Sequence, residues 1–201
     1  MTQTDEEKAR YQARMAKKKA HIDQKVAEAT EERGIIIVLT GNGKGKSTAG
    51  FGNVARCVGH GFKAGVIQFI KGTWACGERD LLEQHGVECH VMATGFTWDT
   101  QDKAKDTAAA QAVWQSGKAM LTNPELRLVL LDELTYMIRY GYLDESEVIT
   151  ALQNRPKQQS VIITGRGCPK ALIELADTVS EIKPVKHAFD AGIKAQQGID
   201  W

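Results

Sequence analysis

The sequence lacks any apolar run approaching the roughly 20 residues that a membrane-spanning helix needs. Its charged N-terminus also lacks the apolar core of a signal peptide. Neither sign of charge dominates, because 26 basic residues stand against 25 acidic ones and leave a net charge of +1. This balance argues against nucleic acid as a partner and against a polybasic membrane anchor. We therefore expect a cytoplasmic protein without either kind of partner.

Cysteine is scarce, and no two of the four cysteines form a C-x-x-C pair. The usual spacing of a zinc site is therefore missing, and we expect reduced thiols that act as small buried hydrophobic groups rather than as catalysts or metal ligands. Internal repeats and low-complexity tracts are also missing. The length of 201 residues suits one domain with a substantial core.

Residues 1–33 differ from the rest in being rich in Lys, Arg, Glu, Gln and Ala. Their larger apolar side chains, Tyr11, Met15, Ile22 and Val26, are spaced by 4, 7 and 4 residues, which places them along one stripe of a helix. The stripe is thin, so this helix either frays in solution or docks over a ligand or a partner subunit. Composition alone slightly favours fraying. We expect residues 1–33 to form a helical arm that precedes a domain spanning 34–201.

From Gly34 onward, apolar runs alternate with amphipathic stretches. This alternation predicts a parallel sheet covered by helices on both faces. The expected fold is an α/β three-layer sandwich with a mostly parallel sheet, of the P-loop NTPase and RecA-like kind. The expected strands are 35–39, 64–70, 87–92, 126–131, 161–164 and 178–182, and the expected helices are 47–58, 78–85, 107–121, 145–153 and 170–175.

A glycine-rich loop, TGNGKGKS, follows the first strand directly. Such a loop can surround phosphates with backbone N–H groups and supply a lysine and a metal-binding hydroxyl. The usual spacing requires Gly at position 40, where Thr40 stands, so the loop counted from Gly41 is one residue short. We expect a nucleoside triphosphate here, with a catalytic Lys46 and with Ser47 on Mg²⁺ or Mn²⁺. The candidate contacts are Gly41, Asn42, Gly43, Lys44, Gly45, Lys46 and Ser47.

Two other strand ends carry polar groups. The run 128–131 ends in Asp132 and Glu133, which we expect near the phosphate loop and its metal, because ligands bind at the carboxyl edge of parallel strands. The segment 164–167, with Arg166 between two glycines, ends the fifth strand at the same edge. It either brings Arg166 and backbone N–H groups to a ligand or is a simple turn into the next helix.

Phe96 and Trp98 stand two residues apart just after the third strand. In extended chain such residues point the same way, so they could form one apolar wall at the ligand-bearing edge. Alternatively, both rings fill the core under a loop. Lys71 and Trp74, after the second strand, are weaker candidates for ligand contact.

Together these motifs resemble the P-loop type of ATP:corrinoid adenosyltransferase of bacterial cobalamin metabolism. The resemblance runs from about residue 31 to the C-terminus and rests on the segments GIIIVLTGNGKGKS, QFIKGTW, MATGFTW, LDELTYM, ITGRGC and PVKHAFDAGIKAQ. The family has the same shortened loop, and Thr is common there where Ser47 stands.

The resemblance implies that Co(I) of a corrinoid, such as cobalamin or cobinamide, attacks C5′ of ATP and expels triphosphate. It also implies ATP in the reverse of its common P-loop orientation, and Ser47 and Glu133 as metal ligands. Arg56, Lys71 and Arg166 would be ATP contacts, and Asp132 would orient water or the phosphate loop.

For the corrinoid, the resemblance implies that Phe96 and Trp98 displace the axial ligand and so ease reduction to Co(I). The N-terminal helix would fold over the corrinoid across the partner subunit of a homodimer, and a reduced flavoprotein would supply electrons.

Two alternatives from other functional classes remain open. A hydrolase or kinase acting at the γ-phosphate would yield ADP or phosphate, with Asp132 and Glu133 serving metal and water. A nucleotide-sensing module would bind ATP without turnover and dock a partner through its arm. Product analysis distinguishes the three.

Overall fold

The computed structural model describes residues 4–70, 75–92 and 102–200. The chain divides into two compact units, Met1–Glu32 and Arg33–Trp201. In the part of the chain that the structure describes, no helix has both the length and the apolar character needed to cross a membrane.

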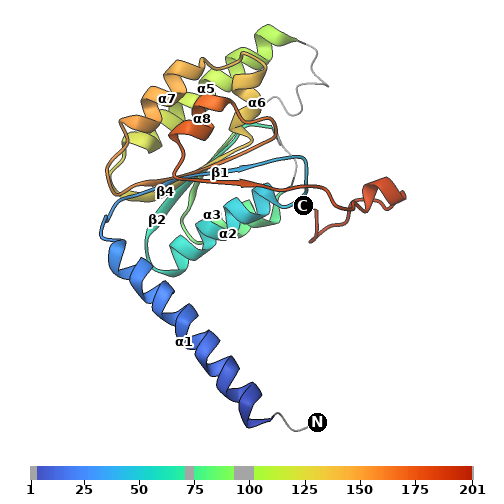
Figure 1. Cartoon of the computed structure of the whole chain (residues 1–201). Helices are drawn as coiled ribbons and strands as arrows, with labels where there is room; N and C mark the ends of the chain where they lie inside the picture. The colour runs from blue at the N-terminus through green and yellow to red at the C-terminus, as the bar shows by residue number, and fades with distance from the viewer. Residues whose placement is uncertain (1–3, 71–74, 93–101, 201) are drawn as a thin grey trace. The chain divides into compact units, whose positions relative to one another are not determined.

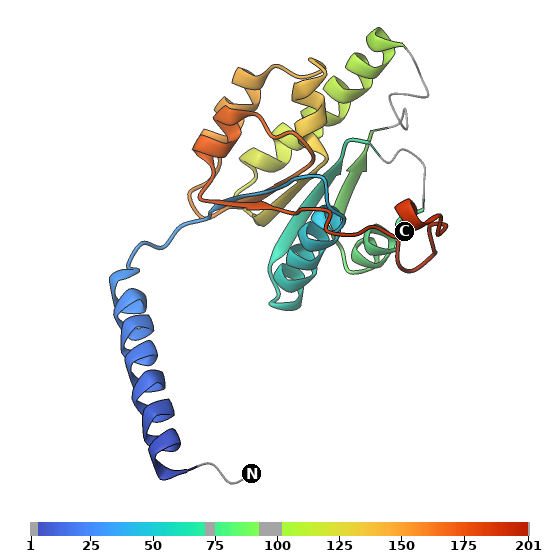
Figure 2. The same cartoon turned by 45° about the vertical axis from the view of Figure 1, so that its right-hand side comes forward.

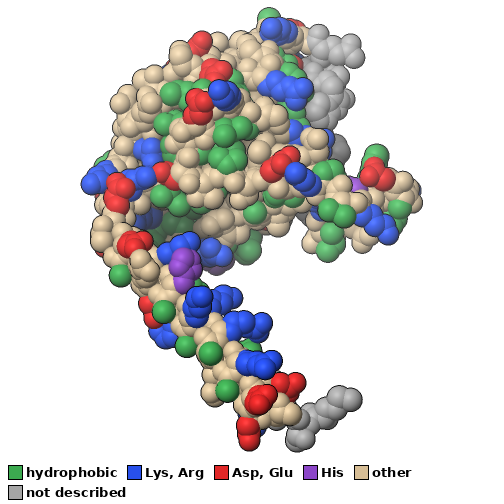
Figure 3. Space-filling view, viewed as in Figure 1, with side chains coloured by type: hydrophobic (Ala, Val, Ile, Leu, Met, Phe, Trp, Pro, Cys, Tyr) green, Lys and Arg blue, Asp and Glu red, His purple; other side chains and the backbone are tan. Residues whose placement is uncertain are grey.

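The first unit is the single helix α1 (Asp5–Glu28). Thr4 caps it in a capping box: its hydroxyl accepts from the Glu7 N–H at 3.3 Å, and its own N–H donates to the Glu7 carboxylate at 3.0 Å. No residue of α1 is buried, and charged side chains run along it with single hydrophobic ones between them (Figure 3). The predicted helix is confirmed, and three of its four stripe residues, Tyr11, Ile22 and Val26, are exposed within this unit.

The second unit is built on a six-stranded sheet with the order β3-β2-β4-β5-β1-β6, and every described pair of neighbouring strands is parallel. Strand β5 lies between β1, which leads into the phosphate loop, and β4, which ends in Asp132. This order is that of RecA-like domains, so the predicted fold is confirmed. The strands are β1 (Ile36–Thr40), β2 (Lys63–Gln68), β3 (Glu88–Val91), β4 (Leu126–Asp132), β5 (Ser160–Thr164) and β6 (Thr178–Glu181).

Helices cover both faces of this sheet, which completes the three predicted layers (Figures 1 and 2). One face carries α2 (Lys46–Gly59) and α3 (Gly77–Gln84). The other carries α5 (Lys103–Thr122), α6 (Leu134–Arg139), α7 (Glu145–Gln153) and α8 (Lys170–Leu175). A short 3₁₀ helix, η1 (Phe189–Ala191), lies beyond β6.

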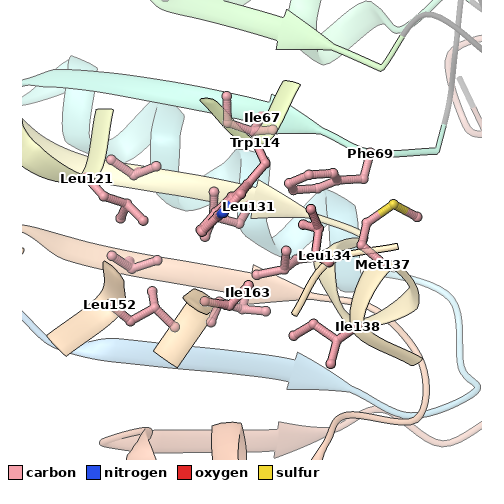
Figure 4. Close-up of a cluster of buried hydrophobic side chains, with 14 of the residues drawn as sticks. Ile67, Phe69, Trp114, Leu121, Leu131, Leu134, Met137, Ile138, Leu152 and Ile163 are labelled. Atoms are coloured by element: carbon pink, nitrogen blue, oxygen red, sulfur yellow. The ribbon is translucent and has the colours of Figure 1, made fainter. Parts of the chain in front are cut away.

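The core lies on both sides of the sheet, and β4 shows why its sequence is continuously apolar. Val129 and Leu131 belong to the cluster under α5–α8, whereas Leu128 and Leu130 belong to the cluster under α2 and α3. Alternate residues thus serve opposite faces, as expected for a strand buried on both. The larger cluster includes Trp114, and part of it is shown in Figure 4.

Several predicted boundaries shift by a few residues. Helix α5 begins at Lys103 rather than 107, because the Asp102 carboxylate caps it by accepting from the Lys105 N–H at 3.1 Å. Strand β2 ends at Gln68 rather than Ile70, although Ile70 is still buried in the core. Helix α6 was not predicted at all.

Candidate active site

The phosphate loop, residues 41–45, joins β1 to α2 and depends on glycine for two reasons. Gly41 and Gly45 have φ of 97° and 115°, a region that side chains with a Cβ rarely adopt. A Cβ at Gly41 or Gly43 would also lie 2.5 or 2.8 Å from the carbonyl oxygen of Ile182. The Gly43 N–H donates to that same carbonyl at 2.7 Å. The loop is therefore packed tightly against the residue that follows β6.

Lys46 is the first residue of α2, and its ammonium group lies inside the loop. The side chain is buried, and Nζ donates to the Gly43 carbonyl oxygen at 2.7 Å. Burial lowers the pKa of Lys46; Glu133 opposes this shift, Arg166 adds to it, and Asp132 opposes it. Glu133, Arg166 and Asp132 are thus close enough to act on the ammonium, and the sequence predicted all three at this edge. Ser47 follows, half-buried, whereas Asn42 and Lys44 are exposed.

Glu133 stands between β4 and α6 in a strained backbone conformation. Its φ of 62° is the sole positive φ of a residue other than glycine in the described segments. Its N–H donates to the Thr164 hydroxyl at 2.9 Å, which ties this turn to the end of β5. Strain of this kind costs about 1–3 kcal/mol and concentrates at functional sites. The turn places a carboxylate near Lys46 at the carboxyl edge of the sheet.

Asp132 is buried, and both of its carboxylate oxygens accept hydrogen bonds from side chains. Oδ1 accepts from the Thr164 hydroxyl at 2.7 Å, and Oδ2 accepts from the Gln68 amide at 3.2 Å. The Gln68 carbonyl oxygen in turn accepts from Arg79 at 3.3 Å. This network joins the ends of three adjacent strands, β2, β4 and β5. In this network Asp132 orients the side chains of Thr164 and Gln68, and this role suits it better than binding a metal.

Changing Thr164 to valine keeps its shape but removes the hydroxyl that bonds both Asp132 and the Glu133 N–H. We expect a loss of about 1–3 kcal/mol in the free energy of unfolding, because buried polar groups lose their partners. Urea unfolding measures it. Thr150→Val is the matched control, since the Thr150 hydroxyl bonds only the Ser146 carbonyl on the exposed side of α7. Equal losses in the two variants would contradict a special role for the network.

The segment after β5 is fixed against α6. Gly165 has a φ of 137°, and a Cβ there would lie 2.0 Å from the Thr135 hydroxyl. That hydroxyl donates to the Arg166 carbonyl oxygen at 2.9 Å. Burial raises the pKa of Tyr136, Glu133 raises it further, and Arg166 lowers it, so Tyr136 also borders this group of charges. The structure therefore brings Arg166 to the edge that carries Lys46 and Glu133.

One predicted residue, Arg56, lies away from this edge. Arg56 lies in the last turn of α2, ten residues past Lys46 and thus about 15 Å along the helix axis. It lines a cavity of about 280 Å³ with residues from the start of β1, such as Ile37. Its role as an ATP contact therefore stays a prediction. Lys71, Phe96 and Trp98 lie outside the described residues, as does Trp74.

The described residues offer no cluster of three or more His, Cys, Asp or Glu side chains that could hold a metal ion by themselves. Magnesium in nucleotide sites usually takes one or two protein ligands and completes its shell with phosphate oxygens and water. A hydroxyl from Ser47 and a carboxylate from Glu133 are the hard oxygen donors that this ion prefers. The donor set fits Mg²⁺ bound together with a nucleotide.

All four cysteines are thiols outside any disulfide, and three of them are only partly buried. Burial raises the pKa of Cys89 to about 12 and that of Cys168 to about 11. Both therefore carry neutral thiols at ordinary pH, which suits packing rather than nucleophilic chemistry.

Sequence reasoning missed Gln68, Arg79 and Thr135, and it named Thr164 only as the start of a turn. A signal existed for Gln68 and Thr164, because a single polar residue at the end of an apolar parallel strand lies where ligands bind. Arg79 and Thr135 carry no such signal. Each is one ordinary polar residue in a short helix.

Comparison with known proteins agrees with this geometry. A family model described as ATP:corrinoid adenosyltransferase BtuR/CobO/CobP matches residues 32–201. The chain belongs to the ATP:corrinoid adenosyltransferase family. A second model, described as the N-terminal part of cob(I)alamin adenosyltransferase, matches residues 1–26.

Relatives from this family match nearly the whole chain. The corrinoid adenosyltransferase CobA of Salmonella typhimurium is 66% identical over 96% of this chain and 98% of its own length. Corrinoid adenosyltransferases of Escherichia coli K12 and Pseudomonas aeruginosa are 65% and 48% identical. The E. coli match covers 96% of this chain and 98% of that protein, and the P. aeruginosa match covers 100% of both. The resemblance noted in the sequence is thereby confirmed.

Proposed function

We propose that this protein transfers the 5′-deoxyadenosyl group of ATP to Co(I) of a corrinoid and releases triphosphate. Family membership over most of the chain supports the reaction. The single structural observation that carries it is the buried Lys46 ammonium, held in a glycine loop beside Glu133 and Arg166.

The reaction is a displacement at carbon. The electron pair of the substrate's Co(I) forms a Co–C bond to C5′, and the C5′–O bond breaks with its electrons leaving on the triphosphate. No proton has to be removed from the nucleophile. This accords with the geometry of Asp132, whose two oxygens accept hydrogen bonds from Thr164 and Gln68 and so hold the ends of neighbouring strands together.

Negative charge grows on the leaving triphosphate, and the loop suits that change. Backbone N–H groups at the start of α2, together with the ammonium of Lys46, are fixed before the substrate arrives, so they lower the barrier electrostatically. When ATP binds, the ammonium would exchange the Gly43 carbonyl oxygen for a phosphate oxygen. Ser47 and Glu133 would hold Mg²⁺ or Mn²⁺, which neutralises part of the triphosphate charge when bound.

The corrinoid side of the reaction is proposed from the family alone. Phe96 and Trp98 would displace the axial ligand of Co(II), and α1 would fold over the corrinoid in a homodimer. Cobalamin and cobinamide are the proposed acceptors, and a reduced flavoprotein in the cytoplasm is the proposed electron donor. Lys71 and Arg56 would contact ATP.

Product analysis tests the proposal. Protein, Mg-ATP and chemically reduced cobalamin should yield light-sensitive adenosylcobalamin and intact triphosphate in equal amounts, whereas ATP without the corrinoid should persist. Phosphate or ADP released without the corrinoid would favour a hydrolase instead. Binding of ATP with no product under any reductant would favour a nucleotide sensor.

A further inference from the structure

The chain beyond β6 returns to the phosphate loop and contacts it at two places. We call residues 182–200 the C-terminal strap. At its start, Ile182 donates its N–H to the Thr40 carbonyl at 2.8 Å and accepts from the Gly43 N–H at 2.7 Å. At its end, the Asp200 carboxylate pairs with the Lys44 ammonium at 2.5 Å. The strap therefore holds both the backbone and one side chain of the loop.

A local turn orients the Asp200 carboxylate independently of its ion pair with Lys44. Its carboxylate accepts from the Gln196 N–H at 2.8 Å, and its own N–H donates to the Gln196 carbonyl at 2.8 Å. This local turn sets the direction of the carboxylate. The hydrogen bond from Lys44 also lowers the pKa of Asp200. The Asp200 side chain is 26% exposed, against 45% for Lys44, so the carboxylate is the more enclosed partner.

We propose that Asp200 is a positioning residue for nucleotide binding, which holds the Lys44 ammonium beside the phosphate loop so that it meets the triphosphate already ordered. The inference rests on the proposed function only in taking this loop as the ATP site. It assigns a role to the end of the strap, which the reaction chemistry does not require.

Asp200 has two opposite effects on ATP binding, and their balance decides whether it strengthens or weakens the affinity. An exposed lysine loses rotamer freedom when it binds phosphate, and a partner that already orders it reduces that loss. A carboxylate near a triphosphate also repels it. The pair with Lys44 is neutral as a unit, and an ammonium has three donors, of which Asp200 uses one and others can meet phosphate oxygens. Ordering should therefore outweigh repulsion.

A double-mutant cycle on the affinity for Mg-ATP tests this role, measured by titration calorimetry on the full chain. Asp200→Asn should weaken Mg-ATP binding roughly three- to tenfold, as expected for one side chain that is no longer pre-ordered. In steady state the KM for ATP should rise while kcat at saturating ATP stays nearly unchanged. In a Lys44→Ala background, Asp200→Asn should no longer weaken binding, because without Lys44 the carboxylate only repels the triphosphate.

Two more variants control for charge and for folding. Asp190→Asn removes the same charge from η1 in the same strap and should leave the affinity unchanged. Asp200→Glu should restore most of the affinity, because it keeps the carboxylate. Unchanged or tighter binding by Asp200→Asn would overturn the proposal, as would equal weakening with and without Lys44. The titration uses Mg-ATP alone, so its result can be interpreted even if the product assay detects no adenosyl transfer.

Discussion

Replacing Lys46 with alanine should lower the rate of adenosyl transfer roughly a hundredfold or more, which corresponds to a few kcal/mol of transition-state stabilisation. The reason lies in its position. The buried ammonium is held within the loop at 2.7 Å from the Gly43 carbonyl oxygen, where a phosphate oxygen would replace that partner. Single-turnover assays with chemically reduced cobalamin measure the effect without depending on the electron donor.

Lys63→Ala is the matched control for this change. Lys63 begins β2 at the opposite edge of the sheet and forms an exposed ion pair with Glu125 at 3.1 Å. Loss of such a pair should change stability by at most about 1 kcal/mol and leave the rate unaltered. A Lys46→Ala variant that adenosylates near the normal rate would remove the loop from the mechanism.

Changing Glu133 to glutamine should have the second large effect. The amide keeps the shape of the side chain but loses the charge that would bind Mg²⁺. We expect a loss of roughly ten- to a hundredfold in rate, together with a higher magnesium concentration for half-maximal activity. Measuring the rate against magnesium concentration at fixed ATP separates this from simple damage to the fold.

Glu125→Gln makes the same chemical change in the partner of Lys63, far from the loop, and should alter neither quantity. If Glu133→Gln lowers the rate with no change in magnesium dependence, Glu133 is not a ligand of the metal. Its strained turn would then act only through the position of neighbouring groups.

The fold could be predicted largely because strands buried on both faces leave short apolar runs that alternate with amphipathic stretches. The run 126–131 has no polar residue except Arg127, as a central parallel strand requires. Helix α6 escaped prediction because six residues following a strand directly, without a proline or glycine to mark the break, carry too little periodicity. Its start depends on the left-handed Glu133, a conformation that side-chain propensity argues against.

The loop, Glu133 and Arg166 could be predicted as a group because each follows a strand and parallel strands end at one edge. The hydrogen-bond partners could not. That Asp132 is bound by Gln68 and Thr164 depends on which strands are neighbours, and the sequence does not give the strand order. Arg56 is a case where the sequence suggested a contact that the structure does not bring about. It lies on α2, the helix that follows the loop, but about three turns away from the loop.

The position of β1 in the sheet bears on how the protein can be made. Its neighbours are β5 and β6, with Ile36 paired to Val161 and Ile37 to Thr178. A ribosome therefore releases the phosphate loop more than a hundred residues before either flanking strand exists. Until then, an apolar segment with two open edges has to avoid pairing with other chains, and contacts this distant in sequence form slowly. We expect fragments ending before residue 160 to bind no nucleotide and to depend on chaperones for solubility.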